Sequence, residues 1–299
     1  MSSRSKRHHF VPKVLQKAFC ADGDRIWYAA RDATGRYSRP ELRNTEKTFW
    51  ERNLYTVLED GLPSDIIEKR YFGTLDDYLG KIIPDITKHF ANREAPLLTG
   101  DDLNGFREAM FVMATRTPDF ISSDDDLVTG RELVQGVLSE TQGNPELENT
   151  PELRKLTREL TDDAILRAYG RNIRVRALVK PNPKIIATLK EFSLRWSIAP
   201  ERHSYILSSL IAYRIGNGGS NGLGSPSMEM WMPISPKIAA VLVRDPENKI
   251  PLAVRDQRDH VREINEFAAR KSRQIASDSE KLLTSLCNAA PIAPDSDKP

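Results

Sequence analysis

The chain has 299 residues, of which 39% are hydrophobic and 29% are charged, and its net charge is +2. This composition is that of an ordinary globular protein, which argues against a disordered or fibrous chain, and the charge does not require a nucleic-acid partner. No apolar run approaches the roughly 20 residues of a membrane-spanning helix, and the basic N-terminus lacks the apolar segment of a secretory signal. The two cysteines, Cys20 and Cys287, are far apart in sequence, which argues against a disulfide scaffold and a thiolate zinc site. We therefore expect a cytoplasmic protein without a membrane partner.

The first third of the chain predicts a hairpin followed by a long helix. Residues 25–31 are rich in strand-favouring side chains and lead through a turn at Gly35 into residues 36–38, as in a β-hairpin. Pro84 should kink the long helix, which covers residues 64–90, or split it in two. Its buried stripe is predicted from apolar side chains that recur every three or four positions, at Ile67, Tyr71, Leu75, Leu79, Ile82, Ile86 and Phe90.

The middle of the chain continues as helices. One is predicted over residues 101–115, with Thr99 as part of an N-terminal capping arrangement. Two more are predicted over residues 125–140 and 151–169. The second of these starts at Pro151, where the missing N–H of proline costs nothing.

Strands return after residue 190. Residues 192–198 alternate apolar and polar side chains, as a half-buried strand does, and strand character continues over residues 205–215 and 228–234. The glycine-rich loop at residues 216–224 lacks the GxxxxGK[ST] pattern and is followed by strand-like sequence. We therefore interpret it as a hairpin loop rather than a phosphate cradle. Residues 258–286 predict a final helix.

Strands thus cluster at two places, with helices between and after them. This segregation predicts an α+β fold rather than a parallel βαβ series, with the helical middle and C-terminus packed around a mainly antiparallel sheet. We expect a single domain over residues 1–299. Its parts are the N-terminal motif and hairpin, a helical region, a strand region and a C-terminal helix, at residues 6–60, 64–190, 191–245 and 258–286.

Arg255 and His260 match the Arg-x4-His spacing of metal-free ribonucleases of the HEPN type, in which the two side chains meet on one helix face. Such a match also arises by chance in a chain with many arginines, so we favour exposed surface at these positions. The hairpin and strand region further upstream fit poorly with an all-helical HEPN fold.

Two adjacent histidines, His8 and His9, stand near the N-terminus. On a strand their side chains point in different directions, so they rarely bind one metal together. One could act as a ligand or a general acid/base while the other makes a structural hydrogen bond. From composition alone, the interpretation that both are partly exposed polar residues is favoured.

The segment around this pair resembles the start of a known family. Residues 7–19 read Arg-His-His-Phe-Val-Pro-Lys-Val-Leu-Gln-Lys-Ala-Phe, similar to the opening signature of the domain of unknown function 4238 family. Weaker matches follow in the right order over nearly the whole chain, at Asn44, Asn53-Leu54-Tyr55, Ile67-Glu68, Arg116-Thr117-Pro118, Trp196, Pro233-Ile234-Ser235-Pro236 and Asn265. The resemblance implies a setting of mobile elements and phage defence.

One position departs from the family pattern. Where the family has Ser-Asp-Asn-Pro, after the strand that contains Trp196, this chain reads Leu-Ser-Ser-Leu at residues 207–210. This stretch contains no acidic residue, and we take Ser209 to stand where the family has its Asp. If the family's activity requires that Asp, this chain has lost or moved it; otherwise the Asp was never used for chemistry.

The first hypothesis for function is a hydrolase that attacks phage DNA in bacterial anti-phage defence, so that the partner is nucleic acid. Its candidate residues would converge in one cleft, with His8, His9 and Glu68 as catalytic groups and Asn44, Tyr55, Arg116, Ser208 and Trp231 binding the substrate. A nuclease would use a divalent metal held by Glu68 and a histidine, with Arg116 on the phosphate. A base-excising DNA glycosylase would need no metal and would stack the flipped base on Tyr55 or Trp231.

The second hypothesis is a non-catalytic sensor or binding module, in which His8 and His9 fasten the N-terminal segment to the core through hydrogen bonds. The HEPN-like ribonuclease is the third. The expected cofactor is accordingly either none or a divalent metal.

Overall fold

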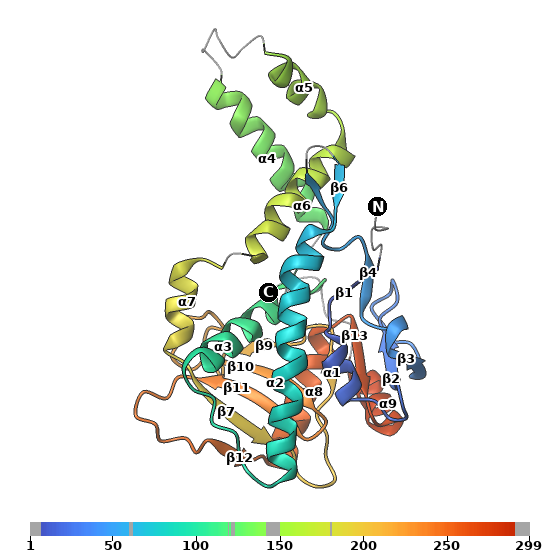
Figure 1. Ribbon diagram of the computed structural model, residues 1–299. Helices are drawn as coiled ribbons and strands as arrows, with labels where there is room; N and C mark the ends of the chain where they lie inside the picture. The colour runs from blue at the N-terminus through green and yellow to red at the C-terminus, as the bar shows by residue number, and fades with distance from the viewer. Residues whose placement is uncertain are drawn as a thin grey trace. The chain divides into compact units, whose positions relative to one another are not determined.

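The structure is a computed structural model that describes residues 7–59, 62–118, 120, 123–141, 150–179 and 181–290. The chain divides into two compact units, each assembled from three separate stretches. The first unit consists of Met1–His8, Arg52–Gly73 and Ile121–Pro181, and the second of His9–Glu51, Thr74–Phe120 and Asn182–Pro299. Figure 1 shows the elements of both units in chain order by colour.

The first unit contains helices and a short strand pair. Its elements are β5 (Val57–Glu59), β6 (Leu62–Ser64), the π-helical turn η2 (Glu68–Phe72), α4 (Ser123–Thr141), α5 (Pro151–Glu159) and α6 (Asp163–Val179). β5 and β6 pair in antiparallel fashion. Asn172 of α6 holds β5 in place, because its side chain accepts the N–H of Leu58 and donates to the carbonyl of the same residue.

Two glycines let α4 and α6 pack at close range. A Cβ atom at Gly130 would lie 1.9 Å from the carbonyl oxygen of Leu166, and one at Gly170 would lie 1.9 Å from that of Asp126. The buried Asp126 side chain is neutralised across the same contact by Arg174, whose Nε and Nη2 bind the two carboxylate oxygens at 2.7 and 2.8 Å. The two glycines and a bidentate ion pair thus join the two helices.

The larger sheet of the second unit has the strand order β12-β7-β11-β10-β9. All neighbouring strands are antiparallel except β12, which runs parallel to β7. Every residue of β11 is buried, as expected for a strand covered on both faces. The strands are β7 (Ser193–Ile198), β9 (Tyr213–Ile215), β10 (Glu229–Ser235), β11 (Ile238–Val243) and β12 (Ala253–Arg255).

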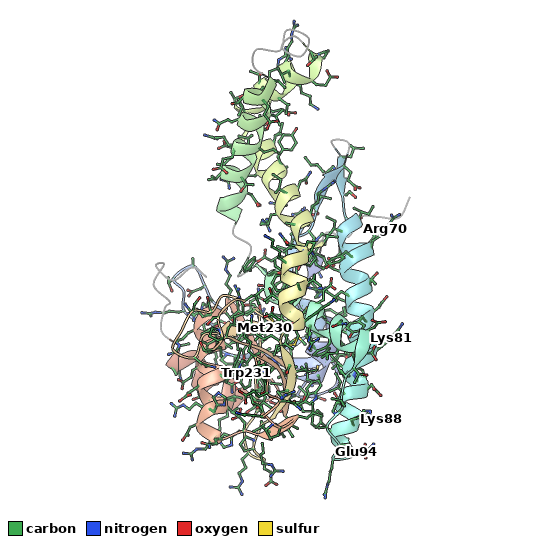
Figure 2. All side chains as sticks on the ribbon, turned by 90° about the vertical axis from the view of Figure 1, so that its left-hand side faces the viewer. Arg70, Lys81, Lys88, Glu94, Met230 and Trp231 are labelled. Atoms are coloured by element: carbon green, nitrogen blue, oxygen red, sulfur yellow. The ribbon has the colours of Figure 1, made fainter. Side chains whose placement is uncertain are left out.

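Helices cover this sheet (Figure 1), namely α2 (Gly73–Ala91) and α3 (Gly100–Thr115) on one face and α8 (Arg258–Lys271) on the other, and α7 (Pro183–Lys190) lies next to α3. On the first face, Trp196 of β7 packs against the rings of Phe90 and Phe106. On the opposite face, Ile264 of α8 belongs to the same core cluster as Trp231 of β10. The exposed Lys81 and Lys88 lie along the outer side of α2 (Figure 2).

A second antiparallel sheet has the strand order β3-β2-β13-β8. Leu283 and Leu286 are buried in the core that this sheet shares with α9. The N-terminal segment adds the strand pair β1–β4, helix α1 and the 3-10 turn η1. These elements are β1 (Arg7–His9), α1 (Lys13–Ala18), β2 (Arg25–Ala30), β3 (Glu41–Asn44), η1 (Thr45–Lys47), β4 (Trp50–Arg52), β8 (Leu207–Ser208), β13 (Gln274–Ser277) and α9 (Glu280–Ala289). The predicted α+β class with mainly antiparallel sheets is confirmed.

The single C-terminal helix predicted over residues 258–286 is wrong. α8 ends at Lys271, β13 follows, and α9 starts only after Ser279, whose hydroxyl accepts the N–H of Leu282. The interruption arises because Ile275 and Ala276 are fully buried between β2 and β8 as a central strand. At the end of α8, the Arg31 guanidinium donates to the carbonyls of residues 269, 270 and 272, which helix geometry leaves without partners.

Other boundaries also differ from the sequence prediction. Within the single helix predicted over residues 64–90, Ser64 ends strand β6 and Glu68–Phe72 form the π-helical turn η2. The helix α2 then runs from Gly73 through Pro84 without being split. β2 pairs with β3 and β13, and the predicted partner segment, residues 36–38, contributes a bridge between Arg31 and Tyr37. Thr99 precedes α3, but its side chain makes no capping hydrogen bond.

Candidate functional site

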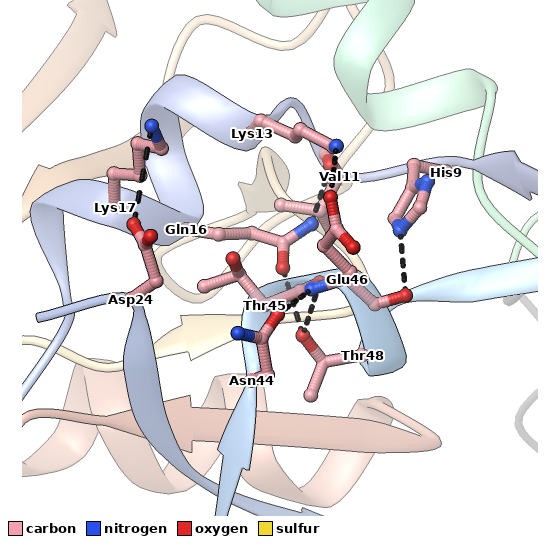
Figure 3. Close-up of polar contacts among 10 residues, drawn as sticks. All are labelled: His9, Val11, Lys13, Gln16, Lys17, Asp24, Asn44, Thr45, Glu46 and Thr48. Atoms are coloured by element: carbon pink, nitrogen blue, oxygen red, sulfur yellow. Dashed lines mark hydrogen bonds and ion pairs between the residues drawn. The ribbon is translucent and has the colours of Figure 1, made fainter.

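His9 and Asn44, two of the predicted site residues, meet at the turn η1 in the second unit (Figure 3). The Asn44 side chain accepts the backbone N–H of Glu46 at 2.9 Å, which caps the turn. Nε2 of His9 lies 3.3 Å from the carbonyl oxygen of the same residue and donates to it when that nitrogen carries the proton. Both side chains therefore contact the backbone of one residue, which is a structural use of both.

Arg116 contacts the backbone of the segment that contains His9. Its side chain is 0% exposed and follows α3, where its Nε donates to the carbonyl of Phe10 at 2.7 Å and its Nη2 to that of His9 at 3.3 Å. Its Nη1 binds Asp76 of α2 at 2.8 Å. A guanidinium that is buried and bonded in this way stabilises the motif and presents no open face to a phosphate.

His8 lies in the first unit and is completely buried. Its Nδ1 accepts the backbone N–H of Tyr55 at 2.9 Å, and the two rings stack with an interplanar angle of 9°. The buried Tyr55 ring in turn contacts Phe72, at 4.3 Å between ring centroids. Glu68 is the first residue of η2 in the same unit, and its side chain is partly exposed. One cleft shared by His8, His9 and Glu68 stays a prediction.

Ser208 and Ser209 lie where the resembled family carries its acidic residue. Ser208 is buried in β8, and within the described part of the chain its hydroxyl has no hydrogen-bond partner. The hydroxyl of Ser209 accepts the backbone N–H groups of Arg273 and Gln274 at 3.0 and 3.1 Å. A carboxylate at residue 209 could accept the same two groups, so the geometry accounts for a polar residue here without catalysis.

Trp231, the remaining predicted residue, leads to a different cluster. It lies in β10 in the interior of the second unit (Figure 2), and its indole N–H donates to Glu229 at 2.8 Å. Its ring contacts that of His260 edge to face, with centroids 5.3 Å apart, and that of Tyr205 at 6.3 Å.

His260 is paired with a carboxylate. Its Nδ1 lies 2.8 Å from Oδ1 of Asp256, and the two side chains are 44% and 9% exposed. The other carboxylate oxygen, Oδ2, lies 2.9 Å from the hydroxyls of Ser197 and Tyr205. The half-exposed imidazole of His260 is thus paired with the Asp256 carboxylate, which two buried hydroxyls contact in turn.

The local sequence explains how the pair forms. The backbone N–H of Asp256 donates to the carbonyl of Ile198, which extends the pairing of β12 with β7 by one residue. Gln257 is the N-cap of α8, so His260 falls in the first turn, four residues after Asp256. Residues four apart across a helix start lie on the same side, which brings the ring onto the carboxylate.

This arrangement prepares His260 for proton transfer. The carboxylate accepts the proton of Nδ1 in a hydrogen bond, which leaves the lone pair on Nε2. Because the side chain is partly exposed, this nitrogen can take a proton from water or from a substrate. Burial raises the pKa of Tyr205 far above its usual value, so its hydroxyl stays protonated and able to donate. The chemical capacity is that of a general base oriented by a carboxylate.

Sequence reasoning missed this cluster although it examined part of it. The Arg-x4-His match was interpreted as exposed surface; Arg255 is exposed at the end of β12, whereas His260 is only partly exposed and belongs to α8. The local signal that was available is the Asp-x3-His spacing at a helix start. Ser197 and Tyr205 carried no such signal, because they lie 59 and 51 residues before Asp256.

Across the described residues, no three or more His, Cys, Asp and Glu side chains are grouped so as to hold a metal ion. Among the same residues, no helix combines the length and apolar character needed to cross a membrane. In comparisons with known proteins, the family model described as "Protein of unknown function (DUF4238)" matches residues 7–281. No curated protein and no solved structure matches the chain.

Proposed function

We propose that this chain, which belongs to the DUF4238 family, is a hydrolase that acts on nucleic acid, DNA in the first instance. The observation that carries this proposal is the 2.8 Å contact between Asp256 and a partly exposed His260. A carboxylate on Nδ1 orients the ring, so that Nε2 can remove a proton from water in the reaction.

The same base serves two reactions on DNA. In a nuclease, the water activated by His260 attacks the phosphorus of a phosphodiester. In a base-excising glycosylase, it attacks the sugar carbon that carries the base, after the nucleotide has been flipped out of the duplex. Both reactions need the oriented imidazole, and they differ in the bond that breaks.

Exposed arginines that flank His260 in the sequence support a nucleic-acid substrate. Arg255 is exposed at the end of β12, while Arg258 and Arg262 are 71% and 74% exposed and pair with Asp259 and Glu266. Exposed ion pairs of this kind contribute little to stability, so a phosphate can replace the carboxylate partner at small cost. Guanidinium groups bind phosphate oxygens through bidentate hydrogen bonds. The setting in anti-phage defence rests on the family resemblance alone.

A non-catalytic sensor or binding module is the second candidate, and the use of the N-terminal motif favours it. His8, His9 and Arg116 contact backbone groups of the protein itself. Side chains occupied in this way fasten the N-terminal segment, as that hypothesis expects.

The test is hydrolysis of phage DNA by purified protein, with His260→Ala as the decisive variant. We expect it to lower the rate by about 10² or more, as for loss of a general base, while the melting temperature stays near that of the wild type. Glu263→Ala removes an exposed carboxylate on the same helix and should leave the rate unchanged. An active His260→Ala variant would show that the general base lies elsewhere.

Chelation then separates the two chemistries. Cutting that disappears with EDTA indicates a metal nuclease. Damage that survives EDTA and appears as breaks only after alkali indicates abasic sites and hence a glycosylase. No damage to any DNA or RNA would favour the binding module over the hydrolase.

A further inference from the structure

The carboxylate of Asp256 has one side toward the surface and one toward the core. Its Oδ1 accepts the N–H of Gln257 and faces Nδ1 of His260, each at 2.8 Å. Its Oδ2 lies 2.9 Å from both Ser197 Oγ and Tyr205 Oη, and these two hydroxyl oxygens lie 2.7 Å from each other. Three oxygens from separate stretches of chain therefore form a closed triangle on the buried side of the site.

The number of protons limits what this triangle can do. Each hydroxyl carries one proton, so an ionised carboxylate and two hydroxyls can form two hydrogen bonds among their three contacts. Either both hydroxyls donate to Oδ2, or one donates to the other, which then donates to Oδ2. Removal of either hydroxyl leaves the second one able to donate to the carboxylate.

The backbone around Tyr205 is held independently of its hydroxyl. The side chain of Asn265 in α8 accepts the N–H of Ile206 at 3.0 Å and donates to the carbonyl of Ser204 at 2.8 Å. The N–H of Tyr205 itself donates to the carbonyl of Pro236 at 2.8 Å. Loss of the hydroxyl alone should therefore leave this segment in place.

Ser197 and Asp256 are also fixed by their backbone. Ser197 lies within β7, whose neighbours are β11 and β12. Asp256 precedes the N-cap of α8, a position occupied by Gln257. Because Asp256 is not the N-cap residue itself, helix capping does not explain why two hydroxyls lie within hydrogen-bond distance of its Oδ2.

We infer that Ser197 and Tyr205 form a redundant pair of positioning residues, which hold Asp256 in the orientation that keeps the proton of His260 on Nδ1 and leaves Nε2 open. Either hydroxyl suffices, and loss of both lets the carboxylate turn away from the ring. This role takes its catalytic meaning from the function proposed above, but the state of the ring is measurable without a substrate.

The test compares Ser197→Ala, Tyr205→Phe and the double variant by ¹⁵N NMR of the His260 ring in slightly alkaline buffer, where imidazole rings are neutral. We expect the Nδ1–H tautomer in the wild type and in both single variants, because one donor remains in each. In the double variant we expect the tautomer mixture of a free imidazole. Retention of the Nδ1–H tautomer there, or its loss in either single variant, would overturn the inference.

Tyr213→Phe is the matched control. Tyr213 is a buried neighbour whose hydroxyl has no hydrogen-bond partner within the described residues, so its loss should leave the tautomer of His260 unchanged. A change in this control as large as that in the double variant would mean that general loosening moves the ring, and it would overturn the specific role of the pair.

A hydrolysis assay on the same proteins separates this inference from the proposed function. Each single variant should keep its rate within about threefold of the wild type, and the double variant should lose at least about tenfold more than the two single effects combined, as coupled neighbours do. An active double variant with an unchanged rate contradicts the positioning role. If the tautomer changes as expected but no protein, wild type included, hydrolyses nucleic acid, the function fails and the positioning role stands.

If the double variant does not fold, Tyr205→Phe is examined at the carboxylate itself. The ¹³C shift of the Asp256 carboxylate should move, because only the Ser197 hydroxyl of the pair is left to donate to Oδ2. An unmoved shift would show that the tyrosine hydroxyl does not bond to Asp256, and the inference would be wrong.

Discussion

His8 and His260 differ in what surrounds their rings. His8 is fully buried, and its Nδ1 accepts a backbone N–H from Tyr55. His260 is 44% exposed, and its Nδ1 faces the carboxylate of Asp256. The first environment uses the nitrogen to satisfy the backbone, whereas the second orients the ring and leaves a nitrogen for chemistry. The type of residue is the same, and its partner decides its role.

Replacement of His8 by Ala should destabilise the protein. The change leaves the N–H of Tyr55 buried without its acceptor, which costs about 1–3 kcal/mol, and removes a ring from the stack. Urea denaturation of the variant and the wild type measures the loss of free energy of unfolding. His9→Ala is the control, because His9 is partly exposed and should cost less than about 1 kcal/mol. Lost hydrolysis at unchanged stability would instead support His8 as a catalytic group.

At the scale of elements, the connection from β11 to β12 depends on Asp245. Its carboxylate accepts the N–H groups of Lys249 and Ile250, each at 2.9 Å, and binds Nη2 of Arg195 in β7 at 2.7 Å. Burial alone would raise the pKa of Asp245, but the Ile250 N–H, Arg195 and the Lys249 N–H outweigh it and hold the pKa below its usual value. An ionised Asp245 therefore fastens this connection to the sheet.

The contribution of Asp245 should depend on pH. Because its pKa is lower in the folded chain than in the unfolded one, its stabilisation is present above the unfolded pKa of about 3.9 and is lost as the pH falls through the folded value. The difference in free energy of unfolding between the wild type and Asp245→Asn should thus be constant near neutral pH and shrink on acidification. Denaturation series at several pH values measure it, and a difference that persists or grows in acid would contradict this account.

The crossing of α4 and α6 should tolerate no side chain at its glycines. In Gly170→Ala, the new Cβ would lie 1.9 Å from the carbonyl oxygen of Asp126, so the helices must separate, at a cost of about 1–3 kcal/mol or more. Gly136→Ala on α4 is the control, since its Cβ meets nothing within 4 Å and should stabilise the helix by about 0.5–1 kcal/mol. Thermal unfolding followed by circular dichroism compares them. Equal melting temperatures would show that the helices are not packed this closely.

At the scale of the whole molecule, spectroscopic probes divide between the two compact units. All four tryptophans, at residues 27, 50, 196 and 231, lie in stretches of the second unit, whereas α4, α5 and α6 lie in the first. Tryptophan fluorescence therefore reports the second unit, and circular dichroism reports the helices of both. Coincident transitions by different probes are the mark of a single cooperative unit.

The single-domain prediction can be tested with these probes. Each unit is assembled from three stretches that alternate along the chain. The folding of one unit therefore holds the ends of the stretches that form the other. We expect the fluorescence and circular dichroism curves in urea to share one midpoint. Loss of helical signal at lower urea than the fluorescence change would show separate unfolding and make the single-domain prediction wrong.

The sequence by itself determined the elements whose pattern is local. The helix over residues 101–115 and the strand over residues 192–198 were predicted from apolar spacing and agree with α3 and β7 within one residue, because side chains three, four or two apart share a face whatever the rest of the chain does. The family was also recognised from the N-terminal motif. The α+β class follows from the order of such elements along the chain.

Only the tertiary structure decided where the helix after residue 258 stops and which residues surround His260. Gln274–Ser277 became a strand because β2 and β8, both remote in sequence, flank it on either side. Ser197, Tyr205 and Trp231 reached Asp256 and His260 from other strands and loops. Such contacts form when distant stretches bury apolar surface together and must satisfy each other's polar groups. Pairing of that kind depends on the whole fold and cannot be predicted from the spacing of residues along the chain.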